Sequence, residues 1–153
     1  MKHLLTSLLI GTSLLAGSCS NQTANEATPT FKETTLAVVP TETTRLTAVL
    51  IHADWCGSCK ILDPKLKSVT GSAEFDDTVF VTLDYTQKDK TAFYQSAEAA
   101  KIATPVRDFL GDKVKTGQML LIDMDDQKVL GVITKDMDEK AIAGALQAAA
   151  AEA

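Results

Sequence analysis

Two cysteines, Cys56 and Cys59, stand three positions apart in the stretch ADWCGSCK, which also holds the only tryptophan of the chain, Trp55. A pair at this spacing can form a redox-active disulfide, supply part of a metal site, or act as a short structural crosslink. Redox activity requires that one of the two thiols loses its proton easily, because the thiolate is the nucleophile. A helix N-terminus provides this, because its unpaired N–H groups and its dipole lower the pKa of a nearby thiol.

The residues around the pair predict a strand followed by a helix. Residues Thr47–Ala53 form a continuous apolar run with β-branched side chains, typical of a strand buried on both faces. Apolar side chains then recur at helical spacing, with lysines on the other side: Ile61, Leu62, Leu66 and Val69. We therefore expect Cys56 to begin this helix as an exposed, attacking thiolate. Cys59, one turn further, is expected to be sheltered and to resolve the mixed disulfide.

Several neighbours of the pair have side chains suited to a supporting role. Trp55 offers a flat apolar surface beside the reactive sulfur, and Gly57 allows a substrate backbone to approach closely. Ser58 stands where a proline ring would stiffen the loop. His52 is either a packed, hydrogen-bonded strand residue or a titrating group that tunes the thiols or relays a proton. Lys60 is a second candidate for tuning the thiols.

The rest of the domain predicts an α/β fold with a mixed central sheet and helices on both faces. A second strand, Thr78–Tyr85, is separated from the first by a helix and should run parallel to it. Residues Gln118–Lys135 form two apolar runs around a polar turn, which predicts an antiparallel hairpin. The expected helices are about Lys88–Ala103, a short one from Thr104 and Pro105 to near Gly111, and one from about Met137 capped by Asp136 and Glu139.

The N-terminus carries the pattern of an export signal. Lys2, an apolar run and small residues precede Cys19, which resembles the bacterial lipoprotein signal in which that cysteine is lipidated. We expect residues 1–18 to be a signal peptide, 19–35 a flexible tether and 36–153 the folded domain. Lipidation of Cys19 would leave Cys56 and Cys59 as the only free pair. Ser20 after the lipidated cysteine resembles a signal for the periplasmic face of the outer membrane of a Gram-negative cell.

The charge composition limits the classes of partner that we expect. The chain of 153 residues has a net charge of −5, and no basic patch appears. Nucleic acid is therefore not expected as a partner. The length suits one domain, which we expect to be monomeric.

The sequence resembles the thioredoxin-fold family over residues 36 to 150. The resemblance depends on the hexapeptide WCGSCK, the strand before it, Pro64 and the terminal hairpin plus helix. The ADWC context also resembles periplasmic thioredoxin-like domains that receive electrons from a membrane-embedded reductase. The resemblance implies an envelope thiol–disulfide oxidoreductase, acting as a reductase on protein disulfides. Cys56 is then the nucleophile and Cys59 the resolving thiol, and the disulfide takes the place of a cofactor.

Three positions depart from the family. Leu50 stands where thioredoxin has a buried aspartate. Thr82 stands where the family usually has a lysine that faces this aspartate. Both members of the ion pair are therefore replaced together, which leaves no unpaired buried charge. The family also places a cis-proline opposite the disulfide. Counting along the hairpin puts Gly117 there, after Thr116, with a displaced Pro105 as the alternative. We favour Gly117, and expect Pro105 to start a helix.

Two other interpretations of the cysteine pair stay open. A copper-binding module could use Cys56, Cys59 and His52, because thiolates select Cu(I). The other histidine, His3, lies in the signal. A purely structural crosslink would close a very short loop and stabilise little.

Overall fold

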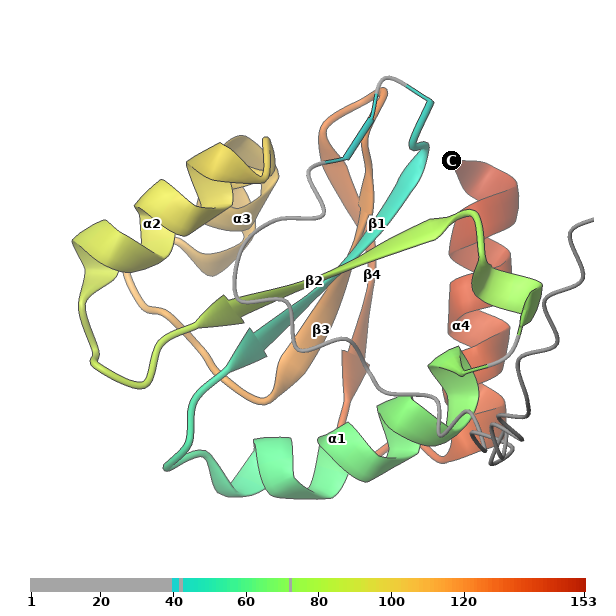
Figure 1. Ribbon diagram of the computed structural model, residues 1–153, viewed down its shortest axis with the longest axis horizontal. Helices are drawn as coiled ribbons and strands as arrows, with labels where there is room; N and C mark the ends of the chain where they lie inside the picture. The colour runs from blue at the N-terminus through green and yellow to red at the C-terminus, as the bar shows by residue number, and fades with distance from the viewer. Residues whose placement is uncertain (1–39, 42, 72) are drawn as a thin grey trace, which may run out of the picture.

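The computed structural model describes residues 40–41, 43–71 and 73–153 (Figure 1). Several predicted segments lie outside the described residues: the signal peptide 1–18, the tether 19–35 that begins with Cys19, and the first residues of the predicted domain. Within them, no helix is long and apolar enough to cross a membrane.

The described residues form a four-stranded sheet with helices on both faces. The elements are β1 (Leu46–His52), α1 (Gly57–Thr70), a 3₁₀ turn (Ala73–Phe75), β2 (Thr78–Asp84), α2 (Lys90–Ala99), α3 (Ala103–Leu110), β3 (Gln118–Asp123), β4 (Lys128–Thr134) and α4 (Glu139–Glu152). The strand order is β2-β1-β3-β4. β1 is parallel to β2 and antiparallel to β3, and β3 and β4 form the hairpin. The predicted mixed α/β sheet is confirmed.

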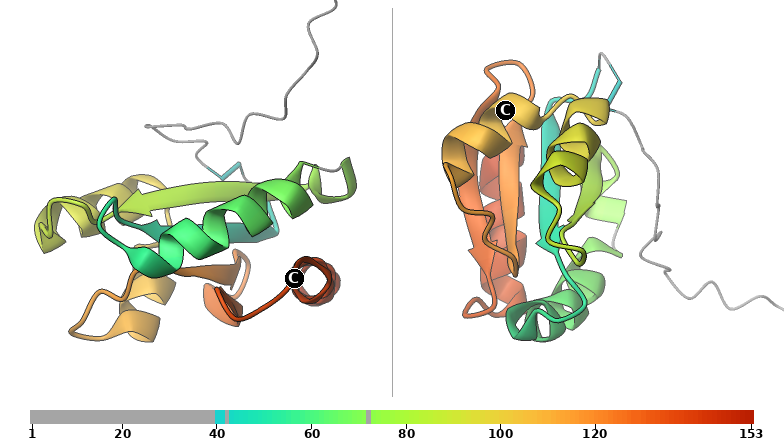
Figure 2. Two further views of the ribbon diagram at one scale, coloured as in Figure 1. Left: turned by 90° about the horizontal axis from the view of Figure 1, so that it is seen from below. Right: turned by 90° about the vertical axis from the view of Figure 1, so that its left-hand side faces the viewer.

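Alternation along β1 divides the interior into two apolar clusters. Ala48 and Leu50 point to the face covered by α1 and α4, where Leu62 and Leu146 pack. Val49 and its alternating neighbour Ile51 point to the opposite face, under α2 and α3. Figure 2 shows the sheet between these two pairs of helices. Because β1 is central and buried on both faces, it is a rigid support for the loop that follows it.

The helix boundaries correct several sequence predictions. The single helix expected to reach Ala103 ends at Ala99, and α3 begins at Ala103. Pro105 lies inside α3, which confirms its helical assignment, but the N-cap residue is Ile102 and not Thr104.

Two further details differ at α1 and α4. The N-cap of α4 is Asp138, whose carboxylate accepts the N–H of Ala141, so the predicted cap at Asp136 is wrong. Ile61 is 50% exposed, whereas Leu62 is fully buried. The apolar face of α1 is therefore narrower than predicted, and Ile61 lies on its outer side.

Candidate active site

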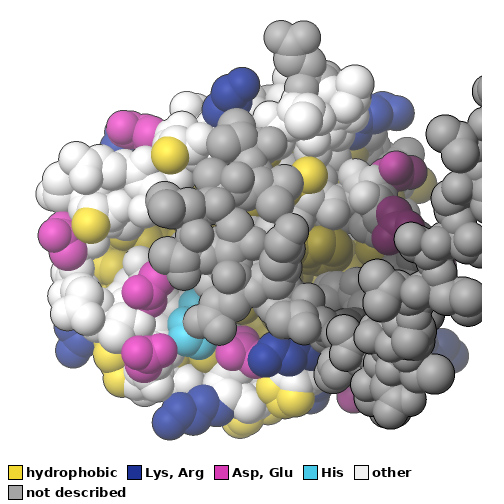
Figure 3. Space-filling model, in the orientation of Figure 1, with side chains coloured by type: hydrophobic (Ala, Val, Ile, Leu, Met, Phe, Trp, Pro, Cys, Tyr) yellow, Lys and Arg dark blue, Asp and Glu magenta, His cyan; other side chains and the backbone are white. Residues whose placement is uncertain are grey.

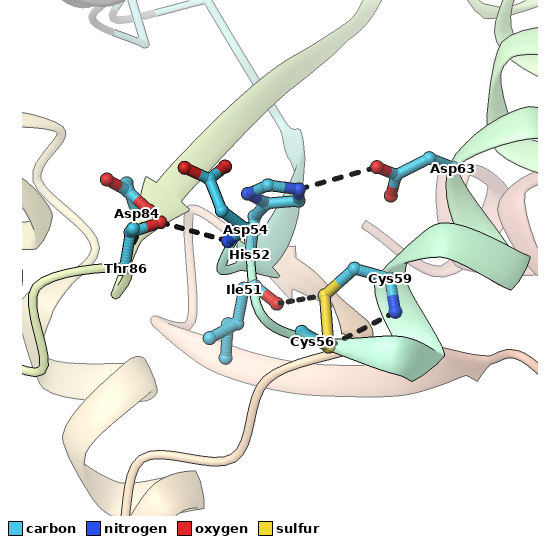
Figure 4. A network of polar contacts seen from close by, with 8 residues as sticks. All are labelled: Ile51, His52, Asp54, Cys56, Cys59, Asp63, Asp84 and Thr86. Carbon is cyan, nitrogen blue, oxygen red and sulfur yellow. Dashed lines mark hydrogen bonds and ion pairs between the residues drawn. A yellow bond between two sulfur atoms is a disulfide. The ribbon is translucent and has the colours of Figure 1, made fainter.

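Cys56 and Cys59 are joined by a disulfide where β1 passes into α1. Their Cα atoms are 5.3 Å apart. Cys56 is the N-cap residue of α1, and its Sγ accepts the backbone N–H of Cys59 at 3.1 Å (Figure 4). The predicted helix-terminal position of Cys56 is confirmed. A sulfur that already accepts a helix N–H group is one whose anionic form the same group stabilises.

The two sulfur-bearing residues differ in access to solvent. Cys59 is fully buried and Cys56 is 5% exposed. Cys56 is thus only slightly more accessible than Cys59, and the expectation that its sulfur is exposed is wrong, because Ala53 and Gly117 pack beside it. The neighbouring Gly57 is exposed, and a methyl group built on it would touch nothing within 4 Å.

Trp55 precedes Cys56, and a residue of the loop after β2 fixes its side chain by a hydrogen bond. Its ring is 50% exposed, and its Nε1–H donates to the carbonyl oxygen of Thr86 at 2.9 Å. The Thr86 hydroxyl accepts the backbone N–H of Asp54 and donates to Asp84. The ammonium of Lys88 lies 5.0 Å from the Trp55 ring centroid. A half-exposed ring fixed in this way is a preformed apolar contact surface.

Gly117 lies directly against the disulfide. Its φ of +80° is in the region that favours glycine, and a Cβ placed there would overlap Ser58 and lie 3.1 Å from the Cys56 Sγ. Its N–H donates to the carbonyl oxygen of Ile51 at 2.8 Å. The structure therefore places Gly117, preceded by the half-buried Thr116, opposite the pair and puts Pro105 elsewhere.

The position of the family's buried aspartate is apolar in this chain. Leu50 is 3% exposed within the cluster under α1, and it pairs in register with Thr82 of β2. The register confirms that the two substituted positions are neighbours. Lys60, the second predicted tuning residue, lies on the exposed side of α1.

A pair of titratable groups, His52 and Asp63, joins β1 to α1. The His52 Nε2 is 3.5 Å from the Asp63 Oδ2, and both side chains are about one quarter exposed. Burial raises the pKa of Asp63, while His52 and Lys67 act in the opposite direction. Asp63 was missed in the sequence analysis. Its spacing of four from Cys59 on one helix was the available signal.

A copper site using His52 receives no support from this arrangement. The Nε2 of His52 faces the Asp63 carboxylate. Among the described residues, no group of three or more His, Cys, Asp and Glu side chains could hold a metal ion.

The thioredoxin family model matches residues 23–100, about half of the chain, so this chain belongs to the thioredoxin family. Chloroplastic thioredoxin F1 of Arabidopsis thaliana is 34% identical over 70 residues, covering 43% of this chain and 38% of that protein. Thioredoxin F-type of Brassica napus is 33% identical over 70 residues, with 43% and 37% covered. The match spans less than two fifths of the length of these relatives.

Among solved structures, the short form of thioredoxin f from spinach chloroplast aligns with a TM-score of 0.47 at 23% identity, over 78% of this chain and 88% of that one. Family membership and the paired cysteines support thiol–disulfide oxidoreductase activity.

Replacing Gly117 by alanine tests the close approach at the disulfide. The positive φ and the overlap with Ser58 should lower the free energy of unfolding of the oxidised protein by about 1–3 kcal/mol. Gly144→Ala is the matched control, because Gly144 lies in α4 with nothing within 4 Å and should gain about 0.5–1 kcal/mol. Chemical denaturation of both variants measures this. Equal effects at the two sites would contradict the assignment.

Proposed function

We propose that this protein is a thiol–disulfide oxidoreductase that works through Cys56 and Cys59. The observation that carries the proposal is the Cys56 sulfur at the N-cap of α1, bonded to Cys59 and accepting its N–H. The proposal accounts for the helix-terminal position, which a structural crosslink leaves unexplained.

The exchange has two steps, written here for a reductase. The Cys56 thiolate attacks a substrate disulfide, so a Cys56–substrate S–S bond forms and one substrate sulfur leaves as a thiolate. The Cys59 thiolate then attacks the Cys56 sulfur, forming the Cys56–Cys59 bond and releasing the second substrate thiolate. Two electrons pass to the substrate, and a thiol reductase must return them to the pair.

Substrate binding is proposed to use the surfaces on either side of Cys56. Trp55 supplies a half-exposed apolar face, and Gly57 leaves open space on the outer side. Ser58 and Gly117 meet on the other side, where Thr116 leads into β3. An extended substrate segment could lie between these surfaces with its cysteine over Cys56.

The cellular setting is also proposed. Cys19 would carry the lipid, holding a monomeric domain in the envelope, at the periplasmic face of the outer membrane in a Gram-negative cell. The electron donor would be a membrane-embedded thiol reductase, and the substrates would be envelope protein disulfides. The supporting observations are the pattern of residues before Cys19 and the ADWC context of the pair. Anchoring raises the effective concentration of the enzyme near partners on the same surface.

Replacing Cys59 by serine should trap substrates. The variant can attack through Cys56 but cannot resolve, so mixed disulfides should accumulate and turnover with a protein disulfide should fall to background. Non-reducing electrophoresis with mass spectrometry identifies the linkage. Cys56→Ser is the control and should trap nothing; trapping that survives this change would contradict the assigned roles.

The reduction potential of the pair tests the direction of electron flow. A reductase should have a potential near that of thioredoxin, about −270 mV. Equilibration with glutathione or dithiothreitol buffers measures it. A value near about −120 mV, as in strong periplasmic oxidants, would make the protein an oxidase.

Replacing Cys19 by serine tests the anchor. The unmodified protein should partition with membranes, and the variant should move to the soluble fraction with its Cys56–Cys59 activity intact. Fractionation with detergent phase separation measures this in the native host. Identical partitioning of the two forms would exclude lipidation at Cys19.

A further inference from the structure

The His52–Asp63 pair comes from the two elements that contact the buried sulfur. Asp63 follows Cys59 by four residues on α1, so the two side chains leave the helix on the same side. His52 directly follows Ile51, whose carbonyl oxygen lies 3.9 Å from the Cys59 Sγ. Figure 4 shows His52 and Asp63 directed toward each other, with the disulfide beside the same strand and helix.

The two carboxylate oxygens of Asp63 have different surroundings. Oδ2 faces the His52 Nε2 at 3.5 Å. Oδ1 is buried and has no hydrogen-bond partner within the described part of the chain. A buried, unpaired carboxylate oxygen is unfavourable until it gains a proton or a donor. Burial also makes this carboxylate a stronger base than an exposed aspartate.

The other charged groups to consider lie on α1, at the ends of β1 and β2, and on α4. On α1, Lys67 lowers the pKa of Asp63. Beside β1 and β2, Asp54 follows His52 in sequence, and Asp84 pairs with His52 in register. On α4, which packs against α1, the charged residues are exposed: Glu139 and Lys140 in the first turn, and Glu152 at the far end, where it pairs with Lys128 of β4. Figure 3 shows a histidine at the surface with acidic and basic side chains next to it, on the side of the molecule that faces the viewer in Figure 1.

We propose that Asp63 accepts the proton of the Cys59 thiol when Cys59 resolves the mixed disulfide, and that His52 positions the Asp63 carboxylate. As the Cys59 sulfur attacks, its proton passes through one water to Asp63, the Cys59–Cys56 bond forms and the Cys56–substrate bond breaks. The substrate sulfur leaves as a thiolate, and Asp63 later returns its proton to solvent. This inference rests on the proposed function, and it assigns the base that Leu50 cannot supply.

Reaction of the reduced protein with an aromatic disulfide, 5,5′-dithiobis(2-nitrobenzoate), separates the two steps. The first coloured thiolate reports attack by Cys56, and the second reports resolution by Cys59. Asp63→Asn should leave the first release unchanged and slow the second at least about 10-fold at neutral pH, the lower range for a lost general base. Asp63→Glu should recover part of the rate. Asp108→Asn, an exposed aspartate of α3, is the matched control.

The pH profile excludes a merely structural role. In the unaltered protein, the rate of the second release should rise with pH as Asp63 loses its proton, and it should stay constant at higher pH. In Asp63→Asn the rate of the second release should instead keep rising with pH well above the carboxylate range, because the Cys59 thiol must then lose its proton to solvent. A wild-type rate and profile in Asp63→Asn would overturn this inference and leave the proposed function intact. Equal slowing of both releases would also overturn it. Absence of the first release in the unaltered protein would instead contradict the proposed function.

Discussion

The hydrogen bond from the Cys59 N–H to the Cys56 sulfur is the interaction on which the site depends. It makes Cys56 both the cap of α1 and the reactive group, so the start of the helix and the chemistry are set by the same atom. The bond requires β1 to end at a fixed place. Burial of β1 on both faces, between the two apolar clusters, fixes that place and gives the loop little freedom.

The sequence patterns that depend on burial predicted the fold well. The apolar run of β1, the parallel partner β2 and the β3–β4 hairpin all follow from periodicity and turn residues. Helix ends were predicted less well, because several acidic residues compete as caps. Asp136 and Asp138 are both plausible from sequence, and only the path of the chain after β4 selects Asp138.

The site divides in a similar way. The positions of Cys56 and Cys59 were predictable from their spacing at the start of a helix. The position of Gly117 was predictable by counting residues back from the strand Gln118–Asp123. Asp63 was not, because its importance depends on how α1 lies over β1 and brings the carboxylate to His52. Ile61 shows the same difficulty: periodicity allows it on the apolar face, and only the packed helix shows that Leu62 takes the buried position.

The lack of a titratable group at Leu50 and the presence of two such groups, His52 and Asp63, are complementary. A carboxylate at Leu50 would lie within an apolar cluster, with the neighbouring Thr82 unable to supply a positive charge. His52 lies two residues after Leu50, at the end of β1, and Asp63 lies on α1. Both side chains remain partly exposed. Partial exposure lowers the cost of desolvation and leaves a path for proton exchange. The core at Leu50 therefore stays apolar, while the titratable pair comes from the same strand and helix that hold the sheltered Cys59.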